Sequence, residues 1–231
     1  MNAGKLARGK VGAVGFDLDG TLFDHRGSAT DGVRLFFRGL EVDLTDKVVD
    51  LWFGVEEAEF EHWRAGRIDF QEQRRRRLRS VLTAVGVAFD GEPVALDQLF
   101  EQYLSEYRRA WRAFDDVAEV LSSLRDRGYR LGLLTNGSED QQLGKLSATG
   151  LAECFDVVCI SETIGVQKPD SRAFDTLARS LEVESHQCLF IGDTFVQDVA
   201  GATAAGMQAF VIERHRKEAL GLSEVIEAAL V

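Results

Sequence analysis

Two carboxylates that lie two residues apart, Asp17 and Asp19, end an apolar segment near the start of the chain. The stretch VGAVGFDLDGTLFD spans residues 11–24, and its first half is typical of a buried strand. Carboxylates at the end of a core strand lose hydration and repel each other, so an unpaired pair is costly. The segment therefore raises the question of what stabilises two acidic side chains at this place.

Polar groups also follow three later apolar segments. They are Thr135 and Asn136 after the second segment, Lys168 after the third, and Asp193 and Asp198 at and after the end of the fourth. Each residue alone has a common structural explanation as a turn, a helix cap or an exposed loop. The carboxyl ends of parallel strands meet at one edge of a sheet, where ligands bind. The joint occurrence of these groups at strand ends therefore predicts one site.

The elements that must position these groups follow an alternating order. Short apolar segments bounded by turn residues predict strands, each buried on both faces, at residues 11–17, 129–136, 156–160, 188–193 and 208–212. Helical patterns separate the later strands, with Gly128 as one predicted stop and Ser138 as one predicted N-cap. Another helix is predicted from Phe195. This order predicts an α/β fold, a Rossmann-like parallel sheet flanked by helices.

The region between the first strand and the rest of the sheet is different, because it contains no convincing strand. Four helical patterns occur there, at residues 30–40, 43–63, 69–86 and 95–111. We therefore expect a catalytic core of residues 1–22 and 107–231 and an inserted four-helix cap domain of residues 23–106. An insert that follows the carboxyl end of the first strand can cover a site at that edge. Its hinges are expected near residues 23–26 and 107–114.

Composition excludes several classes of protein. The 231 residues carry a formal net charge of -11, so the surface repels nucleic-acid phosphates and no nucleic-acid partner is expected. No apolar run approaches the ~20 residues of a membrane helix, so no membrane association is expected. The first apolar stretch is short and is broken by Gly12 and Gly15, which argues against a signal peptide. Three cysteines without a CxxC pair predict reduced thiols and a cytoplasmic location.

One basic segment runs against the acidic composition. Arg74 to Arg77 are consecutive in a helical pattern, so they point all round the helix and cannot form one patch. We expect a solvated helix face there. The oligomeric state is left open by the sequence.

The chain resembles, over essentially its whole length, the haloacid dehalogenase-like hydrolases with a helical cap after the first strand. The sequence DLDGT at residues 17–21 matches the first family motif, and LLTNG at residues 133–137 matches the second. Lys168 in QKPD matches the third motif, and GDTFVQD at residues 192–198 matches the fourth. The resemblance implies that Mg²⁺ is bound by the side chains of Asp17 and Asp193 and by the backbone carbonyl of Asp19. Asp198 would support this metal site.

The resemblance also implies a role for each remaining motif residue. Asp17 would attack phosphorus and form an aspartyl-phosphate, and Asp19 would protonate the leaving group and then deprotonate water. The roles of the others follow the same pattern: Lys168 would neutralise phosphoryl charge, Thr135 and Asn136 would bind phosphoryl oxygens, Gly20 would permit a tight turn, and Thr21 would donate a supporting hydrogen bond. The expected function is a Mg²⁺-dependent phosphatase that hydrolyses a small phosphorylated metabolite.

Three other functions remain open on the same motifs. A phosphomutase would return the phosphoryl group to a sugar, and a non-catalytic phosphate-binding module would use the same fold without turnover. A 2-haloacid dehalogenase is disfavoured, because those family members lack the second aspartate of the first motif, which is Asp19 here. Substrate choice is expected to depend on the cap and its hinges, where the candidates are His25, Arg26, Arg64 and Arg67. Trp52, Phe60 and Trp63 are expected to be packing residues of the cap.

Overall fold

The computed structural model of the chain describes residues 11–216 and 218–230. They divide into two compact units: Arg26–Ala110 form one, and the chain up to His25 together with the chain from Trp111 onward forms the other. The prediction that there is no signal peptide concerns a segment whose first ten residues lie outside the described residues. None of the described helices is long and apolar enough to cross a membrane.

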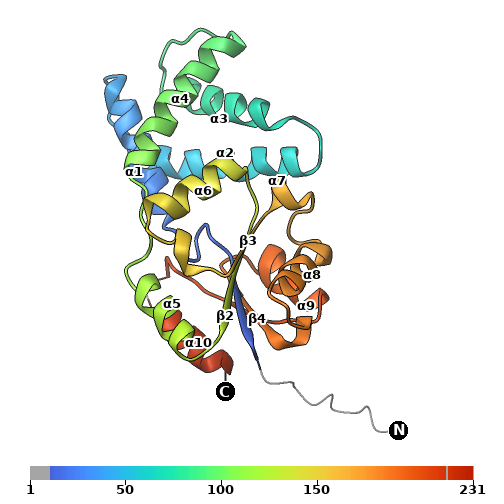
Figure 1. Ribbon diagram of the computed structural model, residues 1–231. Coiled ribbons are helices and arrows are strands. Elements are labelled where there is room, and N and C mark those ends of the chain that lie inside the picture. Colours follow the sequence, from blue (N-terminus) through green and yellow to red (C-terminus); the bar gives the residue numbers. More distant parts are fainter. Residues whose placement is uncertain (1–10, 217, 231) are drawn as a thin grey trace. The chain divides into compact units, whose positions relative to one another are not determined.

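The unit built around the chain's first strand contains a five-stranded sheet. Its strands are β1 (Ala13–Phe16), β2 (Arg130–Thr135), β3 (Val157–Ile160), β4 (Cys188–Gly192) and β5 (Gln208–Val211). Their order is β3-β2-β1-β4-β5, and every neighbouring pair is parallel (Figure 1). The predicted α/β fold is therefore confirmed. Because β1 lies in the middle, its carboxyl end is flanked by those of β2 and β4.

Helices cover both faces of this sheet. On one face lie α5 (Val117–Asp126) and α10 (Leu222–Leu230), and on the other α8 (Ser171–Ser180) and α9 (Gly201–Ala204) (Figure 1). The α8 helix lies very close to the strands, because a Cβ atom at Gly15 would come within 2.7 Å of Leu177. Small residues in the central strand therefore let the apolar face of α8 seat directly on the sheet.

The two edge strands differ from expectation. Phe210 and Val211 of β5 are 38% and 40% exposed, and the first half of β3 is only half-buried. The prediction that all strands are buried on both faces is wrong for these two. An edge strand has a neighbour on one side only, so its apolar side chains are covered less completely.

Five further helical segments of this unit connect these elements within the described residues. They are α6 (Glu139–Ala148), η1 (Ala152–Cys154), α7 (Ser161–Ile164), η2 (Ser185–Gln187) and η3 (Phe195–Ala200). Ser138 stands at the N-cap position of α6 but makes no capping hydrogen bond; the Glu162 side chain accepts one from the Glu139 N–H at 2.7 Å instead. The helix predicted from Phe195 begins as one turn of π-helix, η3, and continues as α9.

The other unit is helical throughout its regular elements. It contains α2 (Asp46–Arg64), α3 (Phe70–Ala84), α4 (Pro93–Arg109) and all of α1 (His25–Gly39) after its first residue. Trp52 and Tyr103 are fully buried and their rings lie 4.5 Å apart, so Trp52 is a packing residue as expected. Phe60 and Trp63 make an edge-to-face contact with ring centroids 5.9 Å apart.

The arginine run of α3 corrects one prediction. Arg77 is only 3% exposed, donates to Glu56 across 2.6 Å, and stacks its guanidinium 4.2 Å over the Trp52 ring. The expected solvated face is therefore wrong at this position. Arginine can be buried here because a carboxylate neutralises its charge and an aromatic face covers its planar group.

Candidate active site

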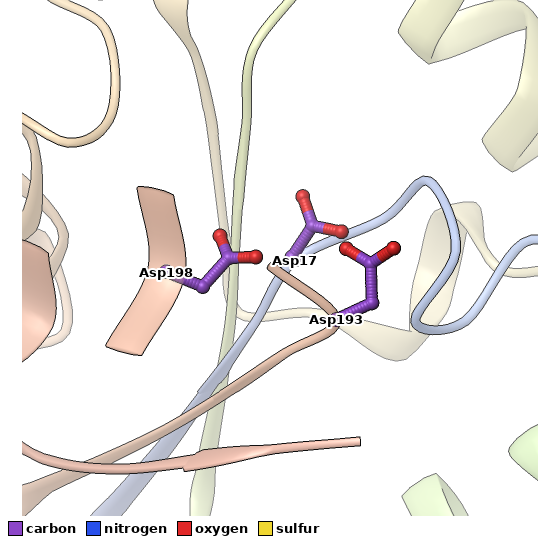
Figure 2. A group of neighbouring side chains, drawn as sticks. All are labelled: Asp17, Asp193 and Asp198. Carbon is purple, nitrogen blue, oxygen red and sulfur yellow. The ribbon is translucent and has the colours of Figure 1, made fainter. Parts of the chain in front are cut away.

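Three carboxylates gather at the carboxyl ends of β1 and β4. Asp17 follows β1, Asp193 follows β4, and Asp198 comes from the π-helical turn η3. Oxygen atoms of the three side chains lie within 4.8 Å of one another, and Figure 2 shows the side chains converging. Gly192 makes this possible, because a Cβ atom there would overlap the Asp198 side chain. We call these three residues the acidic cluster.

One lysine contacts the acidic cluster. Lys168 is 3% exposed, and its Nζ lies 2.6 Å from an oxygen of Asp17 and 2.6 Å from an oxygen of Asp198. The second oxygen of Asp17 accepts a hydrogen bond from the Thr21 hydroxyl at 3.0 Å. Lys168 reaches the cluster from the loop between α7 and α8, and its contact with Asp17 joins segments 151 positions apart in the chain.

The acidic cluster holds more negative charge than Lys168 can neutralise. Burial raises the pKa of Asp17 well above its usual value, although Lys168 opposes this shift. Loss of hydration, together with the Asp198 carboxylate, raises the pKa of Asp193 to about 6. Burial disfavours the charged form of Lys168, but Asp17 and Asp198 outweigh it and raise the lysine pKa. A hard divalent cation fits this set of donors, since carboxylate oxygens are the ligands that Mg²⁺ prefers.

Asp19 has a different set of neighbours. Its two carboxylate oxygens accept hydrogen bonds from Lys145 Nζ at 2.6 and 2.8 Å, and one also accepts from Gln142 Nε2 at 3.0 Å. His25 Nδ1 lies 4.0 Å away. Burial would raise the pKa of Asp19, but the positive charge of Lys145 and the proximity of His25 hold it below its usual value. Lys145 therefore stabilises the ionised form of the Asp19 carboxyl.

Gln142 and Lys145 were missed by sequence reasoning. Both lie on α6 and both are 1% exposed, yet only an ordinary helix was predicted there. They are three residues apart and therefore share a helix face with buried Leu146. A polar residue at a position of the buried face was the one available signal.

Thr135 and Asn136 end β2 and bind other groups of the site. The Thr135 hydroxyl, buried at 1% exposure, accepts a hydrogen bond from Gln142 Nε2 at 2.6 Å. The Asn136 side chain donates to the Lys168 carbonyl at 3.0 Å and accepts from the Lys168 N–H at 2.9 Å. Asn136 thereby holds the backbone of the lysine that contacts the acidic cluster. The expected contact of its own N–H with a phosphoryl group stays a prediction.

The turn after Asp19 depends on a glycine. Gly20 has a φ of +85°, which side-chain-bearing residues rarely adopt, and a Cβ atom there would overlap the Asp193 carboxylate.

The predicted site residues of the four motifs all lie at the carboxyl edge of the sheet, in one unit of the chain. Two of the candidates for specificity in the insert have ion-pair partners: Arg26 contacts Asp50 at 3.2 Å, and Arg64 pairs with Glu61. No ion pair is found for Arg67 among the described residues, and its role in specificity stays a prediction.

A parallel sheet with an acidic cluster, a buried lysine and a threonine at its carboxyl edge defines a class of hydrolases. The model of the haloacid dehalogenase-like hydrolase family matches residues 11–206, and the chain belongs to this family. It is therefore a haloacid dehalogenase-like hydrolase.

Curated relatives and solved structures agree with this assignment. The glyceraldehyde 3-phosphate phosphatase of Methanopyrus kandleri is 31% identical over 209 residues, which cover 88% of this chain and 84% of that protein. The phosphoserine phosphatase of Thermus thermophilus is 36% identical over 124 residues, about half of either chain: 54% of this one and 49% of that one. The magnesium-bound HAD-hydrolase YfnB of Bacillus subtilis has the same fold, with a TM-score of 0.78, 22% identity, and coverage of 96% of this chain and 100% of that one.

Proposed function

We propose that this hydrolase is a Mg²⁺-dependent phosphatase that cleaves a small phosphomonoester through an aspartyl-phosphate on Asp17. Mg²⁺ would be held by the Asp17 and Asp193 side chains and the Asp19 carbonyl, with Asp198 in support, and would neutralise negative charge between the carboxylates and the phosphate. Burial raises the pKa values of Asp17 and Asp193, and a cation that stabilised both carboxylates would offset this cost, which supports a metal at this place.

The first step transfers the phosphoryl group to the protein. An oxygen of Asp17 attacks phosphorus, the bond between phosphorus and the ester oxygen breaks, and the leaving alkoxide takes a proton from Asp19. Lys168 and the Thr135 hydroxyl stabilise the charge that develops on the phosphoryl oxygens. The contact of Lys168 with Asp17 at 2.6 Å supports its part, because it keeps the nucleophile carboxylate in one orientation.

The second step releases phosphate. Water gives a proton to the Asp19 carboxylate as its oxygen attacks phosphorus, and the bond between phosphorus and Asp17 breaks. Burial would raise the pKa of Asp19, but Lys145 and His25 hold it below its usual value, so we propose that Asp19 takes up the proton of the first step as the substrate binds. A dianionic phosphate close to Asp19 favours this, since a nearby like charge raises a carboxyl pKa.

The observation that carries the proposal is a second, separately held carboxyl beside the acidic cluster. Asp19 lies two residues after Asp17, outside the acidic cluster, and is bound by Lys145 and Gln142. An alkoxide leaving group needs a proton, whereas a halide does not, so this carboxyl favours ester hydrolysis over dehalogenation. Among phosphoryl-transfer reactions, hydrolysis is favoured by the relatives named as phosphatases for glyceraldehyde 3-phosphate and phosphoserine.

The substrate class follows from what those relatives have in common. Their names specify different small phosphomonoesters, so we propose a small phosphorylated metabolite and no particular one. We further propose that residues 26–110 act as a cap that selects the leaving group, with hinges near residues 23–26 and 107–114. Phe23 forms an antiparallel bridge with Ala113, and the Asp24 N–H donates to the Arg112 carbonyl at 3.0 Å. The segment that leads into the insert is thus hydrogen-bonded to the segment that leads out of it.

The test is release of inorganic phosphate from a panel of sugar phosphates, phosphoglycolate, phosphoserine, glyceraldehyde 3-phosphate and nucleoside monophosphates, with Mg²⁺ and with excess chelator. We expect Mg²⁺-dependent release from at least one ester and no chloride release from 2-chloropropionate. Conversion of a hexose 1-phosphate into its 6-phosphate without phosphate release would establish the phosphomutase instead. Chloride release without phosphate release would overturn the proposal in favour of dehalogenation.

A further inference from the structure

A buried polar pair on α6, Gln142 and Lys145, links the two parts of the site that would contact the substrate. Each side chain is 1% exposed. Fully buried lysine and glutamine are rare unless their polar atoms have partners. Here the partners are Asp19 and Thr135, which come from the turn after β1 and from the end of β2. The burial of these two polar side chains therefore calls for an explanation.

Each polar atom of the Lys145 and Gln142 side chains has a hydrogen-bond partner, and the donor and acceptor of each bond can be assigned. Lys145 Nζ donates to both oxygens of Asp19 at 2.6 and 2.8 Å and to Gln142 Oε1 at 2.9 Å. Because a lysine ammonium can only donate, it fixes which end of the Gln142 amide is the oxygen. The amide nitrogen must then face the other way, and it donates to Asp19 at 3.0 Å and to the Thr135 hydroxyl at 2.6 Å.

This direction determines where the Thr135 proton can go. The hydroxyl oxygen accepts from Gln142, so its own proton is not used in that contact and is available to another acceptor. A phosphoryl oxygen is such an acceptor. If the Gln142 amide were reversed, its oxygen would accept a hydrogen bond from the Thr135 hydroxyl, and that proton would no longer be available to a phosphoryl oxygen. Lys145 therefore sets, through Gln142, the polarity of a hydroxyl that it does not touch.

The same pair separates the two aspartates of the first motif. Asp17 is bound by Lys168 and Thr21, whereas Asp19 is bound by Lys145 and Gln142, so these four side-chain donors are divided between the two carboxylates. Two carboxylates this close in sequence could otherwise both turn toward a cation. A bidentate lysine contact supplemented by an amide holds the Asp19 carboxyl in one orientation. The Lys145 ammonium also lies 5.0 Å from the centre of the Phe23 ring, which covers it.

We propose that Lys145 and Gln142 are positioning residues that orient the Asp19 carboxyl toward the leaving group and the Thr135 hydroxyl toward the phosphoryl group. This inference rests on the proposed phosphatase function and adds two residues to it. Lys145 and Gln142 contact the side chains of Asp19 and Thr135, so their effect on the substrate must pass through those two residues. Loss of Lys145 should therefore impair the steps that use Asp19 more than substrate binding.

The experiment measures kcat and KM for wild type, Lys145→Met, Lys145→Arg, Asp19→Asn and the double variant Lys145→Met/Asp19→Asn. Each is assayed with 4-nitrophenyl phosphate and with the best alkyl phosphate from the panel. We expect Lys145→Met to lower kcat for the alkyl ester by roughly 10–10³-fold and for the aryl ester by less, because nitrophenolate leaves without protonation. KM should change by less than about threefold, and Lys145→Arg should recover part of the rate.

The double variant distinguishes positioning from a general structural role. If Lys145 acts mainly through Asp19, the fold-loss caused by Lys145→Met should be much smaller in the Asp19→Asn background than in wild type. The part that passes through Gln142 to Thr135 should remain there and should be alike for both esters. Equal losses on both esters, or losses that multiply in the double variant, would overturn the inference. Lys47→Met, which alters an exposed lysine of α2, should keep wild-type kinetics.

A second readout does not depend on turnover. Thermal unfolding of the same variants without metal should show that the double variant loses less than the sum of the two single losses, because each single change leaves a buried partner unpaired. Additive losses would mean that the pair is not formed and would also overturn the inference. In contrast, wild type that releases no phosphate from any ester would overturn the proposed function while leaving this coupling measurable.

Glutamine 142 is tested by Gln142→Glu, which keeps the shape but removes the amide donor. A carboxylate would accept a hydrogen bond from the Thr135 hydroxyl and would no longer donate to Asp19, so we expect a rise in KM or a fall in kcat for both esters. The losses of Gln142→Glu and Thr135→Val should be less than multiplicative in the double variant, because both changes act on the same hydroxyl. An unchanged Gln142→Glu enzyme would overturn the part of the inference that concerns Thr135.

Discussion

Replacing Lys168 by methionine tests the electrostatic balance of the acidic cluster directly. The variant keeps most of the side-chain volume but removes the ammonium that lies 2.6 Å from both Asp17 and Asp198. These three side chains are almost completely buried, so water cannot replace the lost partner. Removing one member of a buried ion pair costs about 3–5 kcal/mol, because the other charge is left uncompensated.

The expected loss can be expressed as a melting temperature. For chains of 150–250 residues, 1 kcal/mol corresponds to about 2–4 °C, so Lys168→Met should lower the midpoint by roughly 6–20 °C without metal. Part of the cost can be relieved when Asp17 takes up a proton, which its raised pKa favours. The loss should therefore be smaller at pH 5 than at pH 8, since the lysine stabilises only ionised carboxylates.

The assay is thermal unfolding followed by circular dichroism in excess chelator, with Lys47→Met as an exposed-lysine control. The double variant Lys168→Met/Asp198→Asn should recover part of the loss, because one of the two carboxylates left without the lysine is then neutral. A Lys168→Met midpoint within about 2 °C of wild type would refute the reasoning. A double variant whose melting temperature falls by more than the sum of the two single decreases would refute the reasoning as well.

Four further outcomes are expected. Asp17→Asn should abolish phosphate release and any phosphoryl adduct detected by mass spectrometry, because an amide cannot replace the carboxylate nucleophile; an adduct on Asp19 would contradict the assignment. Ca²⁺ should support little turnover in place of Mg²⁺, since it takes more oxygen ligands and would draw both oxygens of the nucleophile into coordination; equal rates with both ions would contradict this. The pKa of Asp193 is raised to about 6 from its usual value near 4, so without metal the folded protein loses stability as pH rises through that interval. Mg²⁺ should therefore raise the melting temperature more at pH 7.5 than at pH 5. Equal shifts at both pH values would count against a metal at this carboxylate. Gly20→Ala should weaken that Mg²⁺-induced shift, because its Cβ atom would displace the Asp193 carboxylate and its φ of +85° would be strained; an unchanged shift would show that the turn can adapt.

Much of the architecture could be predicted because it depends on local pattern. Short apolar segments between turn residues identified all five strands, and each strand lies inside its predicted range. The polar residues at strand ends could be assigned to one edge because parallel strands share that edge. Burial at the sheet margins was overestimated, as Phe210 of β5 shows, because the order of the strands is not contained in the pattern of any one of them.

Buried polar residues on helices escaped prediction for a related reason. Whether a polar side chain on a helix is solvated or buried depends on what the rest of the chain places opposite it. Arg77 was expected in solvent, yet Glu56 and Trp52 bury it. Lys145 was unremarked, yet its partner Asp19 lies 126 positions away in the sequence. A single-sequence pattern gives the face of the helix on which a residue lies but not the partner that makes its burial tolerable.

The same limit explains why the two aspartates of DLDGT could not be distinguished by their own neighbourhood in the sequence. Both are acidic, both follow β1, and a cation could attract either. The difference comes from two lysines that lie on separate segments: Lys168 in the loop between α7 and α8, and Lys145 on α6. Lys168 binds both Asp17 and Asp198, and burial raises the pKa of Asp17. Lys145 binds Asp19 alone among the described carboxylates, and it holds the pKa of Asp19 below its usual value although burial opposes this shift. Two different carboxyl groups therefore come from one short motif: Asp17, a nucleophile that needs a cation, and Asp19, a carboxyl held away from that cation. They differ because Lys168 and Lys145, which lie far away in the sequence, each bind one of them.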